Sequence, residues 1–195
     1  VPDKMRTQLY RQYLVKAFSS SNSAKNARLF GNLEKLALVL GLQDGAVRSV
    51  HDELGGVIYR QYCGRALQNG ALGDQERMFL GQIKSTLDME QETCDKLVRD
   101  CELGRVRTMV DVMFERGQVL APDVRKMRDM ADTLDVDLVK DLDVRRERLD
   151  RMFTVELENM VDEGEVTAGD LGAIEELAEP LHVEDADAQK LLVKL

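Results

Sequence analysis

The sequence has no tryptophan, only 3 prolines among 195 residues, and an aromatic content of 5%. Hydrophobic residues nevertheless make up 44% of the chain and charged residues 32%, which excludes a chain too polar to form a core. The apolar residues are mostly aliphatic, as is typical of a helical protein with an aliphatic core. The length is enough for one or two compact domains or for a short repeat array.

Long hydrophobic runs are also absent. The longest, LALVLGL at residues 36–42, is far shorter than the roughly 20 residues that a membrane-spanning helix needs. No signal peptide is visible, no methionine precedes Val1, and the chain stops inside the apolar segment AQKLLVKL. We therefore expect a soluble fragment of a longer protein.

Histidine is scarce, which limits metal binding and acid–base chemistry. Neither His51 nor His182 has a second His or Cys three or four residues away, so a zinc site is not expected. A calcium loop centred on Gly117 would place apolar or basic residues where the first three oxygen ligands are needed. No nucleophile elbow, phosphate loop or dinucleotide-binding motif occurs. We predict no catalytic residue, no metal and no cofactor.

Only 3 cysteines are present, and two explanations of them stay open. Cys94 and Cys101 are seven residues apart, or about 10 Å along a helix, which is too far for a disulfide within one straight helix. Cys63 could face either of them only across packed helices. The three are either buried thiols or candidate redox thiols, in which case the reactive pair involves Cys63.

Positive charge is scarce toward the end of the chain. The net charge is −9, which argues against a nucleic-acid-binding protein. Residues 1–65 contain 10 Lys and Arg against 5 Asp and Glu, whereas residues 151–195 contain 3 against 12. This acidic end is either a solvated surface or a face that attracts basic clients. Its candidate client-facing residues are Glu175, Glu176, Glu179, Glu184, Asp185 and Asp187.

What the sequence does contain is a repeat with a period of 47 residues. The phrase LYRQY at Leu9 returns as IYRQY at Ile58 with two residues of offset, and Gly70, Gly117 and Gly164 fall in register. Four columns of apolar residues keep the same register through four copies. They are Leu33, Leu80, Met127 and Ile174; Leu36, Ile83, Met130 and Leu177; Leu40, Leu87, Leu134 and Leu181; and Leu42, Met89, Val136 and Val183.

Each copy is predicted to be a pair of helices. The shorter helix covers about 74–86 in the second copy, because its apolar columns are spaced by three and four residues. Glu76, Asp123 and Asp170 fall in its first turn, where carboxylates meet the positive end of the helix dipole. Pro122 suits the same turn of the third copy. A tight break follows, and then a longer helix that ends at the aligned glycine.

The longer helices are predicted to differ from one copy to another. Gly55 and Gly56 lie midway along 44–69 and should kink or break that helix, whereas 137–162 has no glycine and is predicted to run as one long helix. No segment is predicted to be a strand. The predicted fold is all-α, an elongated α-solenoid of irregular HEAT-like helix-pair repeats. One helical-repeat domain, 1–195, would contain copies at 1–42, 43–89, 90–136 and 137–183, and a truncated final helix at 184–195.

A family resemblance is carried by two of these copies. A YRQY phrase, a break between helices and a second YRQY phrase follow one another in the chain. They are Tyr10-Arg11-Gln12-Tyr13-Leu14, Leu40-Gly41-Leu42 and Tyr59-Arg60-Gln61-Tyr62. Over residues 9–103 this order resembles the soluble region of the large Tic subunit, the stromal scaffold of the chloroplast inner-envelope protein import translocon. Beyond residue 103 the likeness consists mainly of the repeat rhythm.

The resemblance implies an elongated helical-repeat rod related to HEAT arrays, on the stromal side of the chloroplast inner envelope. It implies a membrane anchor outside this fragment. It also implies three kinds of partner, namely preproteins with their transit peptides, stromal chaperones and other translocon subunits. A regulatory dithiol is associated with plant members of the family, but its cysteines do not match Cys63, Cys94 or Cys101 position by position.

Three functions therefore remain open at the level of the sequence. The first is a non-enzymatic scaffold in chloroplast protein import. The second is a generic helical-repeat adaptor for protein–protein interaction in another pathway. The third is an enzyme whose active site is completed elsewhere in a longer chain, although this sequence shows no convergent catalytic motif.

Overall fold

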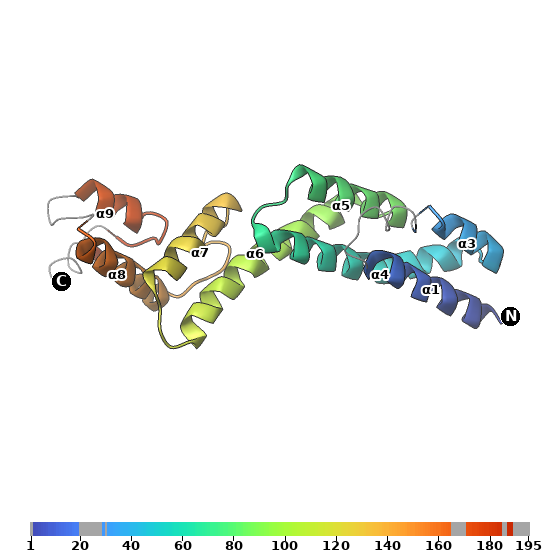
Figure 1. Ribbon diagram of the computed structural model, residues 1–195, viewed down its shortest axis with the longest axis horizontal. Helices are drawn as coiled ribbons and strands as arrows, with labels where there is room; N and C mark the ends of the chain where they lie inside the picture. Colours follow the sequence, from blue (N-terminus) through green and yellow to red (C-terminus); the bar gives the residue numbers. More distant parts are fainter. Residues whose placement is uncertain (1, 20–28, 30, 165–170, 185–186, 189–195) are drawn as a thin grey trace. The chain divides into compact units, whose positions relative to one another are not determined.

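The computed structural model describes residues 2–19, 29, 31–164, 171–184 and 187–188. Within these residues all regular structure is helical and no strand occurs, so the all-α prediction is confirmed (Figure 1). The short helix predicted at about 74–86 is found within one residue of its expected bounds. The elements are α1 (Asp3–Ser19), α3 (Leu33–Leu40), α4 (Asp44–Ala66), η1 (Leu67–Asn69, a 3-10 turn), α5 (Asp74–Leu87), α6 (Gln91–Glu115), α7 (Ala121–Thr133), α8 (Arg146–Asp162) and α9 (Leu171–Ala178).

The helices form two compact units, and the boundary between them falls inside α6. The N-terminal unit covers Val1–Cys101 and the C-terminal unit covers Glu102–Leu195. In the N-terminal unit α4 packs against α1 and α5, and α1 also contacts α3. In the C-terminal unit α8 packs against α7 and α9. In each unit a long helix is therefore covered by shorter helices that precede and follow it.

The backbone turn that follows each short helix recurs every 47 residues. Gly41, Asp88, Asp135 and His182 have left-handed φ angles of 62°, 51°, 51° and 52°. After each of them the next N–H donates to a carbonyl oxygen five residues back, at 3.0, 3.0, 2.8 and 3.0 Å. This is the Schellman motif, which pairs carbonyls that the end of a helix would otherwise leave unsatisfied. The donors are Leu42, Met89, Val136 and Val183, the fourth apolar column of the sequence.

The apolar columns are core positions, but the first copy is covered less than the others. Every member of the column that begins at Leu33 is buried. In the column that begins at Leu40, the residues Leu87, Leu134 and Leu181 are buried whereas Leu40 itself is half-buried. Because α3 has only eight residues and few neighbours, its Leu38 and Val39 are 79% and 83% exposed.

The predicted C-terminal ends of the long helices agree with the structure. Gly70, Gly117 and Gly164 have φ angles of 123°, 71° and 71°, and the long helices stop just before them. Glycine adopts this region without the steric cost that a Cβ brings. Glu76 and Asp123 lie in first turns, and Pro122 is the second residue of α7. The predicted first-turn residue Asp170 lies outside the described residues.

At Gly55 and Gly56, where a kink or a break was predicted, no break occurs. Helix α4 runs unbroken from Asp44 to Ala66 through both glycines. Gly55 is buried, and a Cβ built on it would lie 3.4 Å from the sulfur of Met89. The small residue therefore allows the turn after α5 to approach the helix, and this packing offsets the low helix propensity of glycine.

The prediction of one long helix over 137–162 is wrong. Residues 137–143 form turns, and α8 begins only at Arg146. The Asp137 carboxylate accepts hydrogen bonds from the N–H groups of Val139 and Lys140, at 2.9 and 2.8 Å. Asp143 then has a left-handed φ of 52°. The Asp137 side chain thus bonds backbone N–H groups of a local turn, as short polar side chains commonly do, and α8 begins only after this turn.

Candidate functional site

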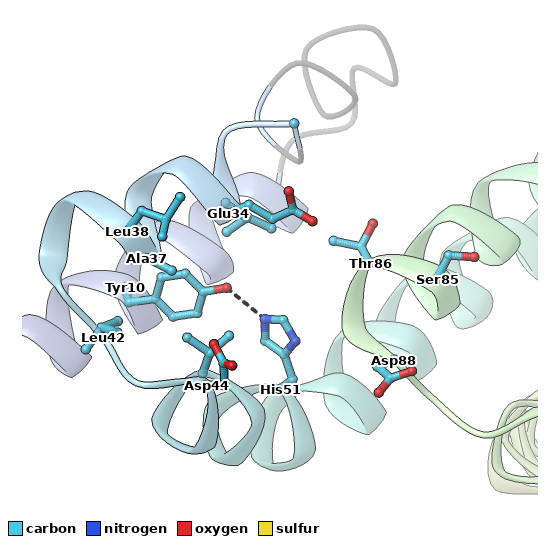
Figure 2. A pocket seen from close by; sticks show the side chains of 13 residues that line it. Tyr10, Glu34, Ala37, Leu38, Leu42, Asp44, His51, Ser85, Thr86 and Asp88 are labelled. Atoms are coloured by element: carbon cyan, nitrogen blue, oxygen red, sulfur yellow. Dashed lines mark hydrogen bonds between the residues drawn. The ribbon is translucent and has the colours of Figure 1, made fainter.

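A cleft with a volume of about 780 Å³ lies within the N-terminal unit. Figure 2 shows α3 on one side of it, the end of α5 on the other and His51 of α4 between them. We call it the Tyr10 cleft after its innermost aromatic residue. Its apolar lining is Leu33, Ala37, Leu38, Leu42 and Val47, and its polar lining is Glu34, Asp44, His51, Ser85, Thr86 and Asp88, with Tyr10 and Gly31.

A tyrosine–histidine pair forms the inner wall of the cleft. The hydroxyl of Tyr10 lies 2.8 Å from Nε2 of His51, and the two rings stack with centroids 5.9 Å apart (Figure 2). Burial lowers the pKa of His51 below its ordinary value of 6.5. Burial and the nearby Glu34 carboxylate raise the pKa of Tyr10 to about 12. At pH 7 both groups are therefore neutral and each satisfies the other.

The tyrosine that begins each YRQY phrase makes a similar contact in both copies. Tyr10 and Tyr59 are its equivalent residues, and both are buried. The hydroxyl of Tyr59 bonds the thiol of Cys94 on α6, as that of Tyr10 bonds His51 on α4. In each case a tyrosine of one long helix reaches the next long helix, where a polar atom satisfies its hydroxyl.

Three carboxylates stand around the cleft. Glu34 and Asp44 lie in the first turns of α3 and α4, and Asp88 is the left-handed residue after α5. All three are exposed. None of the described residues that line the cleft is Lys or Arg. Since His51 is neutral at pH 7, the lining carries a charge of about −3.

The candidate redox thiols lie in the same unit but outside the cleft. All three cysteines are thiols, with Cys63 on α4 and Cys94 and Cys101 on α6. Cys63 and Cys94 are buried, and burial raises the pKa of the Cys94 thiol above its ordinary value. The Sγ of Cys101 lies 3.7 Å from the carbonyl oxygen of Arg60. A high thiol pKa slows thiolate chemistry at Cys94.

A second, smaller groove occupies the equivalent place in the C-terminal unit. Its volume is about 350 Å³, and we call it the His182 groove. Ala131, Asp132 and Val136 lie 94 residues, or two periods, after Ala37, Leu38 and Leu42. The same offset relates other members of the two linings. The His182 groove is lined by Arg128, Ala131, Asp132, Asp135, Val136, Asp137, Leu138, Lys140, Glu179, Pro180 and His182.

Asp137 contacts two other side chains of the His182 groove. Its Oδ1 lies 3.0 Å from Nε2 of His182, and its Oδ2 lies 3.2 Å from Nζ of Lys140. The backbone N–H of Lys140 is the main cause that lowers the pKa of Asp137 to about 2. Arg128 and Lys140 of this groove are thus each paired with a carboxylate of the chain, whereas the described residues that line the Tyr10 cleft include no Lys or Arg.

A buried ion pair near that groove was not predicted from the sequence. Glu156 of α8 is the buried charged residue of the described part of the chain. Its Oε1 lies 2.8 Å from Nη1 of Arg128 and 3.7 Å from Nε of Arg125. Two periods earlier the position holds Tyr62, whose ring packs on Phe79 at 4.4 Å between centroids. The burial of residue 156 could have been predicted from the repeat alignment, which places it at an inward-facing position.

The acidic residues predicted to face clients are placed in part. Glu175, Glu176, Glu179 and Glu184 are exposed, and Glu179 lines the His182 groove. Asp187 is half-buried and pairs with Arg146 at 3.4 Å, while Asp185 lies outside the described residues. The exposed glutamates are free to act as a charged surface, and nothing in their placement distinguishes a solvated face from a binding face.

Two searches of the described residues complete the description. No group of three or more His, Cys, Asp or Glu side chains is arranged to hold a metal ion there. None of the helices described is both long and apolar enough to cross a membrane.

Comparison with known proteins gives no match to a protein family, to a curated protein or to a solved structure.

Proposed function

We propose that the chain is a non-enzymatic docking scaffold that offers the surfaces of repeated helix pairs to other proteins. The observation that carries this proposal is the identical helix-ending turn at four positions 47 residues apart. Equivalent turns set equivalent grooves beside them, as the Tyr10 cleft and the His182 groove illustrate. Repetition of one unit produces extended binding surfaces in helical-repeat proteins. We further propose that the helix pairs stack as an elongated α-solenoid of HEAT-like repeats.

A binding role is favoured over catalysis by the chemistry of the larger cleft. Its inner histidine and tyrosine bond each other, and burial moves both pKa values away from neutrality. General acid–base catalysis is most efficient when the pKa lies near the working pH. The pair is therefore better suited to hold α1 on α4 than to move protons.

The pathway we propose is protein import at the chloroplast inner envelope, on its stromal side. The support is the order of phrase, break and phrase over residues 9–103 that resembles the large Tic subunit. The partners would be preproteins and their transit peptides, stromal chaperones and other translocon subunits. An adaptor for protein–protein interaction in another pathway is the alternative, because helical repeats serve many partners.

A peptide titration tests the proposed pathway. A labelled transit peptide, rich in Arg and Ser and poor in acids, should bind the whole chain weakly, and less tightly as salt rises. A peptide of equal length with its arginines replaced by glutamine is the control. Equal affinity for both peptides, or no binding to either, would reject transit peptides as clients and leave the general adaptor.

The acidic residues of α9 supply a second test of client attraction. Glu175, Glu176 and Glu179 are exposed, so their neutralisation leaves the core unchanged. If they steer a basic client, the triple Gln variant slows association more than it speeds release, since rim charges act mainly on the encounter. Unchanged association at low salt would show that these glutamates only solubilise the helix.

The proposed solenoid shape is tested by small-angle scattering. A stacked array of helix pairs is longer than a compact domain of the same length, for which a radius of gyration of about 16 Å is expected. A measured radius near that of the compact domain would exclude the extended array.

A further inference from the structure

The Tyr10 cleft combines an exposed apolar wall with three carboxylates that form no ion pair with the described Lys and Arg residues. Leu38 forms the outer part of its wall on α3 and is 79% exposed. Leu42 and Val47 continue the apolar surface along the start of α4. A leucine left this open on a cleft wall can bury more surface only when a ligand covers it, and such burial is favourable.

The negative charge comes from three different elements. Glu34 belongs to α3, Asp44 to α4 and Asp88 to the turn after α5. No Lys or Arg of the described residues forms an ion pair with any of them. In Figure 2 Glu34 and Asp88 lie on opposite sides of His51. The carboxylates are therefore spread around the cleft.

The separation of the three carboxylates favours a ligand with several cations over a single metal ion. A metal ion needs carboxylates that converge on one point, and no such group exists among the described residues. A ligand with several separated cations can meet all three carboxylates at once. A volume of about 780 Å³ is also larger than a bare ion requires and falls within the range of ligand pockets.

We propose that the Tyr10 cleft binds a basic amphipathic peptide segment of a partner protein. Apolar side chains of the segment cover Leu38, Leu42 and Val47, and its Arg or Lys side chains reach Glu34, Asp44 and Asp88. Spacings of three or four residues put apolar side chains on one face of a helix and leave basic ones at its edges. This inference deepens the proposed function, on which it rests, by assigning client binding to one cleft.

The His182 groove provides an internal contrast for this assignment. It lies at the equivalent place two periods later, but Arg128, Lys140 and His182 are part of its lining. Asp132 replaces the exposed Leu38, and Asp137 already pairs with Lys140 and His182. Arg128 stands where the Tyr10 cleft has Glu34, so a basic peptide would meet a like charge at that position, and like charges across an interface oppose binding.

A matched pair of exposed residues tests the apolar wall. Leu38 and Val39 are neighbours on α3 with similar exposure, 79% and 83%, but only Leu38 lines the cleft. Because both are exposed, Leu38→Ser and Val39→Ser should leave folding intact. The labelled peptide is the Arg- and Ser-rich transit peptide described above. We expect Leu38→Ser to weaken its binding about fivefold to tenfold at both low and high salt, and Val39→Ser to change it less than about twofold.

A second variant tests the charges. Glu34→Gln, Asp44→Asn and Asp88→Asn together keep the size of each side chain, and Asn tolerates the left-handed position of Asp88. Binding should weaken about tenfold at low salt, and the loss should shrink at high salt. The control is the triple Gln variant at Glu175, Glu176 and Glu179, which changes the net charge equally and should leave the dissociation rate unchanged.

The outcomes separate this inference from the proposed function. Binding by the wild type that responds to Leu38→Ser and to the cleft triple, but not to Val39→Ser, supports both. Binding that ignores the cleft variants overturns the inference and leaves the scaffold function standing. If both serine variants weaken binding equally, the exposed face of α3 and not the cleft is the site, and the inference fails. If the wild type does not bind the peptide, the proposed client class and the inference fail together.

Discussion

The Tyr10 cleft and the His182 groove are built on the same backbone turn and differ in their side chains. In the N-terminal unit α4 begins three residues after Gly41, so its first turns form the side of the cleft. In the C-terminal unit the turns of 137–143 delay α8 to Arg146 and bring Asp137 and Lys140 into the groove. A repeated turn thus fixes where a groove forms, while local substitutions decide its size and charge.

Equivalent positions of the two units pack through different kinds of side-chain contact. Where α4 places Tyr62 on Phe79, α8 places Glu156 against Arg128. A buried ion pair must offset the desolvation of its charges, so it adds less net stability than its short distance suggests. An aromatic pair has a much smaller desolvation cost. Among the described residues, the N-terminal unit therefore has the more apolar interior, beside a cleft whose three carboxylates form no ion pair with the described Lys and Arg.

The largest expected difference in stability between the two units lies at the aligned leucines. Leu134→Ala should lower the free energy of unfolding by about 2–5 kcal/mol, because Leu134 is buried at the turn after α7. Leu40 is the equivalent residue at the end of α3 and is only half-buried. Leu40→Ala should therefore lower the free energy of unfolding by less than about 2 kcal/mol. Urea denaturation measures both. Equal costs would mean that the two turns are equally covered, contrary to the structure.

The left-handed residues test whether the turns are interchangeable. Gly41→Ala should lower the free energy of unfolding by about 1–2 kcal/mol, because φ is +62° and the new Cβ would lie 3.0 Å from Nη1 of Arg6. Asp88→Gly should raise it by about 0.5–1 kcal/mol by relieving the same strain. Thermal denaturation of both variants is the measurement. Opposite signs support one shared motif, and a destabilised Asp88→Gly would show that its carboxylate matters more than its backbone.

The two glycines of α4 sharpen the contrast with the interrupted counterpart of α8. Gly56→Ala should stabilise the protein by about 1 kcal/mol, because a Cβ there meets nothing within 4 Å and Ala is the better helix former. Gly55→Ala should gain less, since its Cβ would press on Met89 at 3.4 Å. Denaturation midpoints for the two variants provide the check. An equal gain at both sites would show that Met89 moves aside at no cost.

The smallest expected effect is a difference in pH dependence. The pKa of His51 lies below 6.5 in the folded protein, so as pH falls through about 6.5 the unfolded chain binds the proton first and the N-terminal unit loses stability. The pKa of Asp137 is lowered from 3.8 to about 2, so its contribution is present above pH 3.8 and is lost between 3.8 and about 2.

Urea midpoints measured from pH 7.5 down to pH 5 test the histidine. His51→Gln should give a flatter profile than the wild type over that range, because the variant has no proton to gain at residue 51. Asp137→Asn should leave the profile above pH 5 unchanged, since that carboxylate stays ionised there. A His51→Gln profile as steep as that of the wild type would place the pH dependence at another group.

Much of the fold followed from periodic features of the sequence. Apolar residues spaced by three and four predicted α5 and α7, and the aligned glycines predicted where α6 and α8 end. These signals work because they depend on short-range geometry, namely the 3.6-residue turn and the steric freedom of glycine. The errors fell on the long helices. Local propensity predicted a break at Gly55 where packing on Met89 keeps a helix, and a helix at 137–143 where aspartates cap a turn.

The sequence by itself determined an all-helical chain with a 47-residue rhythm, because periodic burial and helix-ending residues are written locally. Only the tertiary structure decided the Tyr10 cleft. Its tyrosine, histidine and three carboxylates come from α1, α3, α4 and the turn after α5, up to 78 residues apart, and no spacing pattern joins them. Tertiary packing also placed a carboxylate-rimmed cleft beside this turn in one unit and a groove that contains ion pairs beside it in the other. Which charges remain unpaired depends on the neighbours that packing supplies, and that information is not local in the chain.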